Sequence, residues 1–239
     1  MSTRHDGRGV AELRPVTIET GVNRYAEGSA LITCGNTRVL CLATVEDKLP
    51  PHKKGSGEGW VTAEYAMLPR ATTTRNQRDR GGRIDGRSQE IQRLIGRAFR
   101  AAIDLRGLGD RTITVDCDVL QADAGTRCAS ITGGFVALHA ALQRLHGASL
   151  IASIPVRHLV AAVSVGVVEG VPLLDLDYEE DFRAEVDMNC VAADDGRFIE
   201  IQGTGERRPF SRPESDALLD LALAGIAELN RSQRHALGI

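Results

Sequence analysis

The sequence has few aromatic residues and lacks the cysteine patterns of disulfide-rich or zinc-binding proteins. Aromatic residues make up 4% of the 239 residues, which argues against a ligand read mainly by aromatic stacking. The five cysteines form no CxxC pair and are odd in number, so a disulfide framework and a structural zinc site are both disfavoured. We interpret these cysteines as small buried hydrophobic residues of apolar strands.

Long hydrophobic runs and nucleophile motifs are also missing. No apolar stretch approaches the roughly 20 residues that span a bilayer, and residues 1–8 are polar and charged. We therefore expect a cytoplasmic protein with no membrane partner. No GxSxG motif occurs and the histidines show no metal-ligand spacing, so a serine or cysteine nucleophile and a histidine-bound metal are disfavoured.

Charge is distributed unevenly along the chain. The formal net charge of −3 excludes a globally basic nucleic-acid binder. Residues 70–106 nevertheless contain ten arginines against four acidic residues, whereas acidic residues concentrate between positions 175 and 195. A basic region and an acidic cluster in one chain suit a polyanionic ligand together with a metal ion.

Hydrophobic patterning predicts strands followed by helices in both halves of the chain. A Gly35-Asn36 turn predicts a hairpin, Ser88 and Gly107 mark the ends of one helix, and Ser211 begins the last helix in a capping box. Predicted strands cover residues 17–20, 29–33, 37–45, 111–120, 159–168, 171–174, 184–193 and 197–202, and predicted helices cover residues 88–106 and 130–146.

These elements predict an α+β fold with similar architecture in its two halves, in which sheets pack on helices. Residues 48–59 are expected to form a loop. Residues 72–86 contain almost no apolar side chain and are expected to form a mobile surface arm.

Two predicted helix starts carry residues that suit an anion. Gly125, Thr126 and Arg127 combine close backbone approach, a hydroxyl donor and a bidentate guanidinium. Arg87 stands where the helix dipole already favours negative charge. For each helix start the alternative is an ordinary turn that carries a solvated arginine. The sequence alone does not show whether the two helix starts lie close together in the fold.

The acidic run suits Mg²⁺ or Mn²⁺, since these ions prefer carboxylate oxygens. Glu185 and Asp187 are expected to face one side of a strand. On a straight strand, Asp181 would lie about 20 Å from Asp187, too far for one ion. The chain must therefore bend near residues 182–183 if both bind one metal. The alternative is a solvated acidic loop.

Short segments spread over nearly the whole chain form one ordered pattern. They are Arg4-His5-Asp6-Gly7-Arg8, Leu13-Arg14-Pro15-Val16, Gly28-Ser29-Ala30, Gly35-Asn36-Thr37, residues 64–72, residues 86–97, residues 116–127, residues 174–181, residues 184–189 and residues 200–204. In these segments the sequence resembles the ribonuclease PH family, the bacterial tRNA nucleotidyltransferases. Short motifs that matched by chance would not occur in this order.

The resemblance implies a phosphorolytic 3′-5′ exoribonuclease that trims tRNA precursors and other structured RNA. Inorganic phosphate is the co-substrate, nucleoside diphosphates are released, and nucleotides are added in the reverse reaction. It also implies two similar β-β-α-type halves in one domain spanning residues 1–239, and a homohexamer, a trimer of dimers. Phosphate binding falls to Arg87, Gly125, Thr126 and Arg127, the catalytic and Mg²⁺- or Mn²⁺-binding acids are Asp181 and Asp187, and RNA contacts fall to Arg70, Arg75, Arg78, Arg80, Arg93 and Arg97.

Two positions depart from the family pattern. Phe182 stands where a small hydroxyl residue is expected, and Ser88 stands where threonine is common. A non-catalytic RNA-binding ring subunit is an alternative, but it conflicts with the presence of the arginines and acids. A domain relative of polynucleotide phosphorylase is a third possibility. Because no RNA-binding domain is appended before Ile239, we expect a stand-alone trimming enzyme instead.

Overall fold

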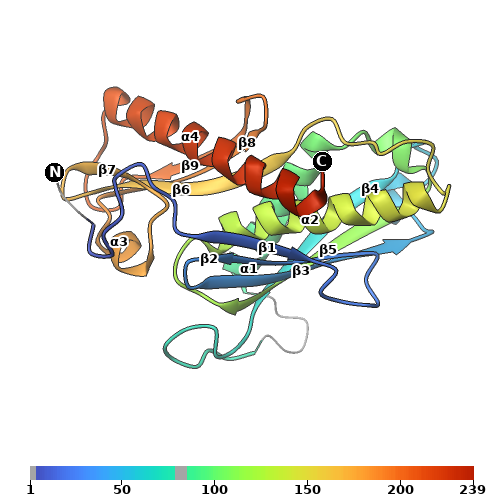
Figure 1. Cartoon of the computed structure of the whole chain (residues 1–239), viewed down its shortest axis with the longest axis horizontal. Helices are drawn as coiled ribbons and strands as arrows, with labels where there is room; N and C mark the ends of the chain where they lie inside the picture. Colours follow the sequence, from blue (N-terminus) through green and yellow to red (C-terminus); the bar gives the residue numbers. More distant parts are fainter. Residues whose placement is uncertain (1–3, 79–84) are drawn as a thin grey trace.

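The computed structural model describes residues 4–78 and 85–239. It contains two β-sheets that share one central helix, α2 (Thr126–Gly147), which contacts strands of both sheets (Figure 1). The α+β fold class predicted from the sequence is confirmed. The prediction for Arg80 falls within residues 79–84, outside the described residues.

The first sheet is five-stranded and mostly antiparallel. Its edge strand β4 pairs with β5 in parallel, because helix α1 (Gly86–Ala102) crosses between them. The hairpin predicted at Gly35-Asn36 is confirmed. In spatial order the strands are β1 (Val16–Thr20), β2 (Gly28–Cys34), β3 (Thr37–Glu46), β5 (Thr112–Gln121) and β4 (Trp60–Met67).

The second sheet is four-stranded and antiparallel throughout. Helix α4 (Arg212–Leu237) packs on it, and the short helix α3 (Tyr178–Arg183) lies between its strands β7 and β8 along the chain. The remaining elements are β7 (Val171–Leu174), β6 (Val160–Val168), β8 (Val186–Ala193), β9 (Phe198–Thr204), and the 3₁₀ turns η1 (Pro51–Lys53) and η2 (Leu105–Leu108).

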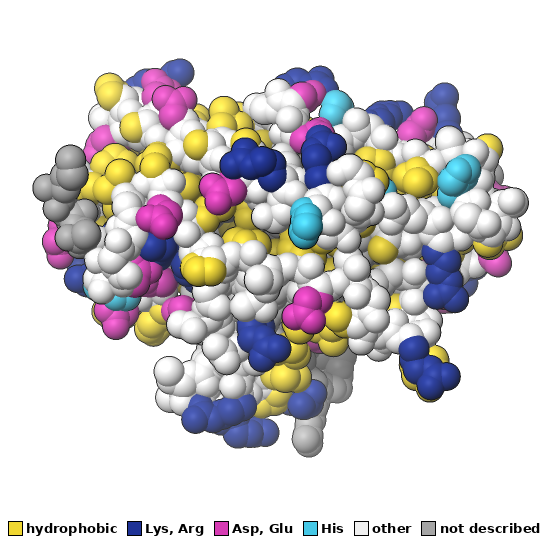
Figure 2. Space-filling model, viewed as in Figure 1, with side chains coloured by type: hydrophobic (Ala, Val, Ile, Leu, Met, Phe, Trp, Pro, Cys, Tyr) yellow, Lys and Arg dark blue, Asp and Glu magenta, His cyan; other side chains and the backbone are white. Residues whose placement is uncertain are grey.

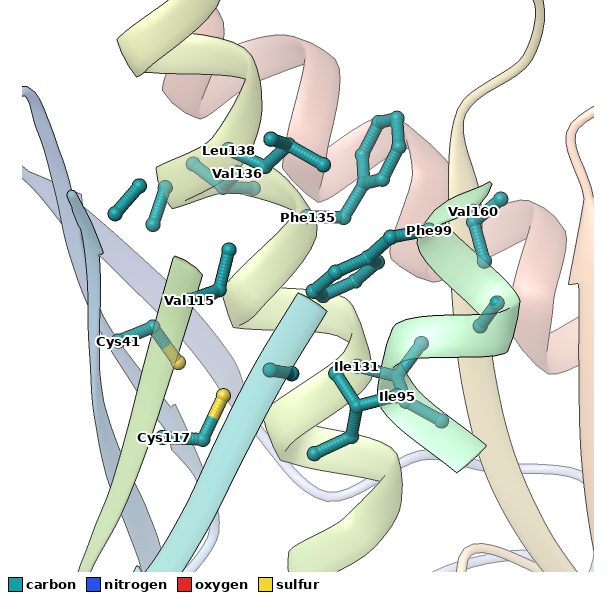
Figure 3. Close-up of a cluster of buried hydrophobic side chains, with 14 of the residues drawn as sticks. Cys41, Ile95, Phe99, Val115, Cys117, Ile131, Phe135, Val136, Leu138 and Val160 are labelled. Carbon is teal, nitrogen blue, oxygen red and sulfur yellow. The ribbon is translucent and has the colours of Figure 1, made fainter. Parts of the chain in front are cut away.

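The main core lies between the first sheet, α1 and α2 (Figure 3). Phe99 of α1 and Phe135 of α2 meet at a ring-centroid distance of 6.2 Å, and Cys41 and Cys117 lie opposite each other on β3 and β5. The five cysteines are free and buried, which confirms their interpretation as small core residues.

Three helical predictions need correction. Helix α1 begins at Gly86 with Asp85, not Ser88, as its N-cap, and it ends at Ala102 instead of residue 106. Residues 155–157 end it, because Arg157 donates its backbone N–H to Ala102 O and Asp104 donates its own to Pro155 O. Helix α2 begins four residues earlier than predicted and is buried on nearly all faces, since it contacts both sheets.

One strand and one α-helix were not predicted. Strand β4 has the alternating burial of a sheet strand, but no element was predicted for residues 60–67. Helix α3 was missed although Asp177 and Glu180 form a capping box, which is a local sequence signal. The capping box of Ser211 and Glu214 at the start of α4 is confirmed. Within the described ranges, no helix is both long and apolar enough to cross a membrane.

Candidate active site

The N-terminus of α2 differs from the other long helix starts because no side chain of the described residues caps it. Asp85 caps α1 and Ser211 caps α4 through their side-chain oxygens. The first N–H groups of an α-helix have no partner within the helix and carry the positive end of its dipole. The start of α2 therefore retains donors that can bind an anion.

Gly125 is required at this uncapped start for two reasons. Its φ of +62° lies in the left-handed region, which side chains with a Cβ rarely adopt. A Cβ at this position would also lie 3.0 Å from Arg14 Nη2. Glycine thus permits the turn from β5 into α2 and leaves the helix start open.

The loop before α2 is held by residues from the N-terminal hairpin. Thr37 Oγ1 donates to Ala124 O at 2.7 Å and accepts from Asp123 N at 2.9 Å. Arg14 donates to the carbonyl of Asp123. The loop is therefore placed by contacts across more than 80 positions of sequence, which no local pattern could have indicated.

Thr126 and Tyr65 form a buried hydroxyl pair under the start of α2. Tyr65 Oη and Thr126 Oγ1 lie 2.8 Å apart, and both side chains are buried. Burial raises the pKa of Tyr65, while the hydrogen bond to Thr126 and the nearby charges of Arg87 and Arg127 act in the opposite direction. Tyr65 therefore remains a neutral phenol that orients Thr126.

Arg127 is held by side chains from α1 and β9. Its Nη1 donates to Gln202 Oε1 at 2.8 Å and lies 3.4 Å from Glu90 Oε2. Gln202 in turn donates to Glu90 Oε1 at 3.1 Å, so it connects the acid and the arginine. Gln202 and Glu90 lie in segments quoted for the family resemblance, but they received no role from the sequence. They are positioning residues for Arg127.

Arg87 lies in the first turn of α1 and is exposed. The positive charges of Arg87 and Arg127 oppose the rise in the pKa of Asp181, and that of Arg127 also opposes the rise in the pKa of Asp187, so both arginines lie near the acids. The fold thus brings together three segments far apart in sequence: the start of α1, the start of α2 and the chain from α3 into β8. The sequence predicted the residues but could not show their proximity.

Helix α3 supplies the bend between Asp181 and Asp187. A six-residue helix replaces the extended chain that would have separated the two carboxylates, and β8 begins only at Val186. The expected strand start at residue 184 is therefore two residues too early. Glu185, just before the strand, pairs with Arg208.

The two acids have raised pKa values. Burial raises the pKa of Asp187 to about 6, with a further contribution from the neighbouring Asp181. Desolvation also raises the pKa of Asp181, against the opposing effect of Arg87 and Arg127. The negative charges of two neighbouring carboxylates repel each other, and a bound cation would reduce this repulsion.

Asp187 also has an unpaired buried oxygen. Asn189 Nδ2 donates to its Oδ2 at 3.3 Å, whereas no donor among the described residues reaches the buried Oδ1. Hard divalent cations bind carboxylate oxygens of this kind. Asp181 and Asp187 therefore fit a divalent metal ion by donor type, charge and unsatisfied bonding.

Asp175, Asp177 and Glu180 of the acidic run pair with buried arginines near the N-terminus. Arg14 Nη2 pairs with Asp175 Oδ1 at 2.7 Å, and Arg4 Nε donates to Glu180 Oε1 at 2.7 Å. His5, Asp177 and Glu180 form a cluster with metal-like spacing. Arg8 Nη2 lies 3.6 Å from Asp177 and 3.5 Å from Glu180, so arginine already neutralises this cluster.

Replacing Arg4 with methionine is expected to lower the free energy of unfolding by about 3–5 kcal/mol, because the buried Glu180 loses the guanidinium that hydrogen-bonds both of its oxygens and keeps only the more distant Arg8. Urea denaturation measures the change. A double variant, Arg4→Met with Glu180→Met, should recover much of the loss, since no unpaired charge remains. Equal stability of the Arg4→Met variant and the unmodified chain would contradict this role.

The arginines predicted to contact RNA occupy two regions. Arg70, Arg75 and Arg78 are exposed on the segment after β4, which projects from the first sheet and carries several basic side chains (Figure 2). Arg93 and Arg97 are exposed on α1. Arg97 makes a two-point ion pair with Glu200 of β9, with Nη2–Oε1 at 2.7 Å, so it also links α1 to the second sheet.

The fold and this site define an α+β protein of the ribonuclease PH type, with one sheet-and-helix half supplying the arginines and the other supplying the acids. Residues 12–142 match the 3′ exoribonuclease family, domain 1, and residues 158–225 match domain 2 of the same family. The chain belongs to the 3′ exoribonuclease family.

Solved structures with a similar fold include chains of two exosomes and rice Rrp46. The Archaeoglobus fulgidus exosome with RNA bound to the active site matches with a TM-score of 0.79 and 26% identity, covering 96% of this chain and 92% of that chain. An archaeal exosome core matches at 0.75 and 25%, covering 97% and 91%. Rice (Oryza sativa) Rrp46 matches at 0.79 and 20%, covering 98% and 100%, which supports the fold alone.

Proposed function

We propose that this chain is a phosphorolytic 3′-5′ exoribonuclease that shortens the 3′ ends of tRNA precursors and other structured RNA. Inorganic phosphate is the co-substrate and nucleoside diphosphates are the products. We propose further that it works in the cytoplasm as a homohexamer, a trimer of dimers. Membership of the family by itself indicates only a 3′ exoribonuclease in general.

The observation that carries the proposal is the uncapped start of α2 beside two arginines. A free phosphate needs several donors and positive charge at one point. The backbone N–H groups after Gly125, the Thr126 hydroxyl and the guanidinium groups of Arg87 and Arg127 supply both. Phosphorolysis requires that this phosphate be held next to the 3′ end of the RNA.

The residues of the site would reduce the repulsion between the reacting groups and hold these groups in position. A phosphate oxygen attacks the phosphorus of the last phosphodiester, the bond to the preceding 3′-oxygen breaks, and that oxygen takes up a proton. Because both reacting groups are anions, the positive charges of Arg87 and Arg127 reduce their repulsion. Phosphate brings its own nucleophilic oxygen, in agreement with the missing serine and cysteine motifs.

Asp181 and Asp187 would hold Mg²⁺ or Mn²⁺. When bound, the ion supplies positive charge that stabilises the developing charge on the reacting phosphoryl group. The buried, unpaired Oδ1 of Asp187 and the raised pKa values of both acids support this assignment. Arg70, Arg75, Arg78, Arg93 and Arg97 would contact the RNA backbone without reading its sequence.

The decisive experiment incubates the purified chain with a 3′-tailed tRNA and Mg²⁺, with and without inorganic phosphate. We expect shortening only when phosphate is present, and release of nucleoside diphosphates, identified by chromatography. Adding nucleoside diphosphates in excess should lengthen the RNA again.

Shortening without phosphate, or release of monophosphates, would rule out phosphorolysis and indicate hydrolysis. RNA binding without any shortening would instead indicate a non-catalytic ring subunit. The same tRNA without the added 3′ tail provides the matched control, because it offers no tail to remove.

A further inference from the structure

Helix α3 exposes two aromatic rings beside the acids of the site. Tyr178 is 59% exposed and Phe182 is 70% exposed, although large apolar side chains usually avoid water. Their ring centroids lie 6.4 Å apart with an interplanar angle of 25°, so the two rings form a stacked pair. The packing of α3 itself does not explain this exposure.

The helical spacing places the aromatic pair on the same side of α3 as Asp181. Residues three and four positions apart are neighbours on a helix surface, so Asp181 and Phe182 both lie next to Tyr178. The opposite side of α3 faces the protein, where Glu180 is buried against Arg4. The pair and the catalytic acid therefore share the solvent-facing surface.

This aromatic surface has a fixed position. Tyr178 donates its backbone N–H to Asp123 Oδ1 at 3.1 Å, which connects α3 to the loop that begins α2. Arg207 Nη2 donates to Phe182 O at 2.9 Å, which connects the other end of α3 to the loop after β9. Both ends of the short helix are thus held, and an exposed arginine lies next to Phe182.

We propose that Tyr178 and Phe182 form a stacking surface for a nucleobase at the 3′ end of single-stranded RNA. Single-stranded RNA is bound by stacking its bases on aromatic side chains while cations hold its phosphates. The surface offers flat rings, and Arg207 and the start of α2 offer positive charge nearby. This inference rests on the proposed function, and it names residues that select an unpaired base.

A nucleobase fits this surface better than a protein partner does. Two rings provide the area of one or two bases, whereas a stable protein interface needs roughly 800 Å² from each partner. The low overall aromatic content disfavoured a ligand read mainly by stacking, and one pair at the reacting end is compatible with that expectation. Stacking tolerates any base, as a trimming enzyme requires.

The test measures binding of 5′-fluorescein-labelled RNA with a single-stranded 3′ tail, by fluorescence anisotropy, without phosphate and with EDTA. Phe182→Ala is expected to weaken binding by about 10-fold, and the double variant with Tyr178→Ala by up to about 100-fold. Phe182→Leu, which keeps an apolar side chain without the ring, should resemble Phe182→Ala.

Abasic RNA distinguishes stacking from a general structural effect. Removing the bases of the last two nucleotides should weaken binding to the unmodified chain to a similar extent, but should add little to the loss in the double variant. Under phosphorolysis conditions Phe182→Ala should raise KM for RNA more than it lowers kcat, because the stack is already present before the reaction.

Tyr25→Ala is the matched control. Tyr25 is 80% exposed and lies in the loop between β1 and β2, at the other side of the molecule from α3 in Figure 1. Its replacement should leave RNA binding unchanged. Unchanged binding of the double variant, or a full abasic penalty in that variant, would overturn the proposal.

Sedimentation of the same variants tests whether the aromatic surface binds a nucleobase or a second copy of the chain. An altered oligomeric state that accounts for the loss of binding would also overturn the proposal. Because the binding assay contains no phosphate, base-dependent binding supports the stacking surface even if phosphorolysis is not observed. Failure of phosphorolysis is thereby distinguished from failure of this inference.

Discussion

Replacing Arg127 with alanine is expected to reduce phosphate-dependent shortening of RNA by about 10²- to 10³-fold, the usual effect of removing one preorganised charge-stabilising donor. The guanidinium is held by Gln202 and Glu90 next to the uncapped start of α2. Its removal takes away both an anion donor and positive charge near Asp187. Initial rates at several phosphate concentrations measure the effect.

A lysine at position 127 should recover part of the activity. Lysine restores the charge but not the planar fork that can bind two phosphate oxygens at once. Arg212→Ala is the matched control, because Arg212 is exposed on α4 and pairs with Asp216. Circular dichroism should show an unchanged fold in all three variants. An Arg127→Ala variant with the activity of the Arg212→Ala control would remove Arg127 from the site.

Replacing Asp187 with asparagine is expected to change stability and activity in opposite directions. The pKa of Asp187 is about 6 in the folded chain, above its ordinary value of 3.8. The folded state therefore binds this proton more tightly than the unfolded state does. Its contribution favours folding below about pH 4 and is lost as pH rises through about 6.

At neutral pH without metal, Asp187→Asn should consequently raise the free energy of unfolding by about 1–3 kcal/mol, because the unfavourable buried charge is gone. RNA shortening should fall to background. Urea denaturation in EDTA measures stability, and the difference between the variant and the unmodified chain should shrink towards about pH 4. Added Mg²⁺ should stabilise the unmodified chain but not the variant.

Asp195→Asn provides a control of opposite sign. Asp195 pairs with the exposed Arg197, and this hydrogen bond lowers the pKa of Asp195. Its replacement should not stabilise the chain at neutral pH, and it should leave Mg²⁺ stabilisation intact. A loss of stability in Asp187→Asn at neutral pH would show that its carboxylate is satisfied by a protein partner.

The local signals in the sequence predicted most elements correctly. Alternating hydrophobic residues and the Gly35-Asn36 turn identified the first hairpin, and Ser211 with Glu214 identified the start of α4. These predictions succeeded because the interactions that form a turn or a helix cap lie within a few residues of one another. The missed helix α3 also had such a signal, the Asp177–Glu180 capping box, hidden within an acidic run that suggested metal binding instead.

Other boundaries depended on distant segments. Helix α1 stops at Ala102, whose carbonyl accepts the backbone N–H of Arg157, although the predicted helix continues to residue 106. Helix α2 is buried all round because both sheets pack against it, and a single apolar stripe did not predict that. Such contacts join positions that the local sequence does not relate.

By itself, the sequence determined the chemistry available to this protein: arginines at two helix starts, a glycine before α2, and carboxylates at positions 181 and 187. Only the tertiary structure decided which of these groups meet. In the folded chain, Asp175 and Glu180 pair with buried arginines. Asp181 and Asp187 instead lie together near Arg87 and Arg127. The physical reason is that buried charges need partners, and packing across the two halves determines which partners are within reach.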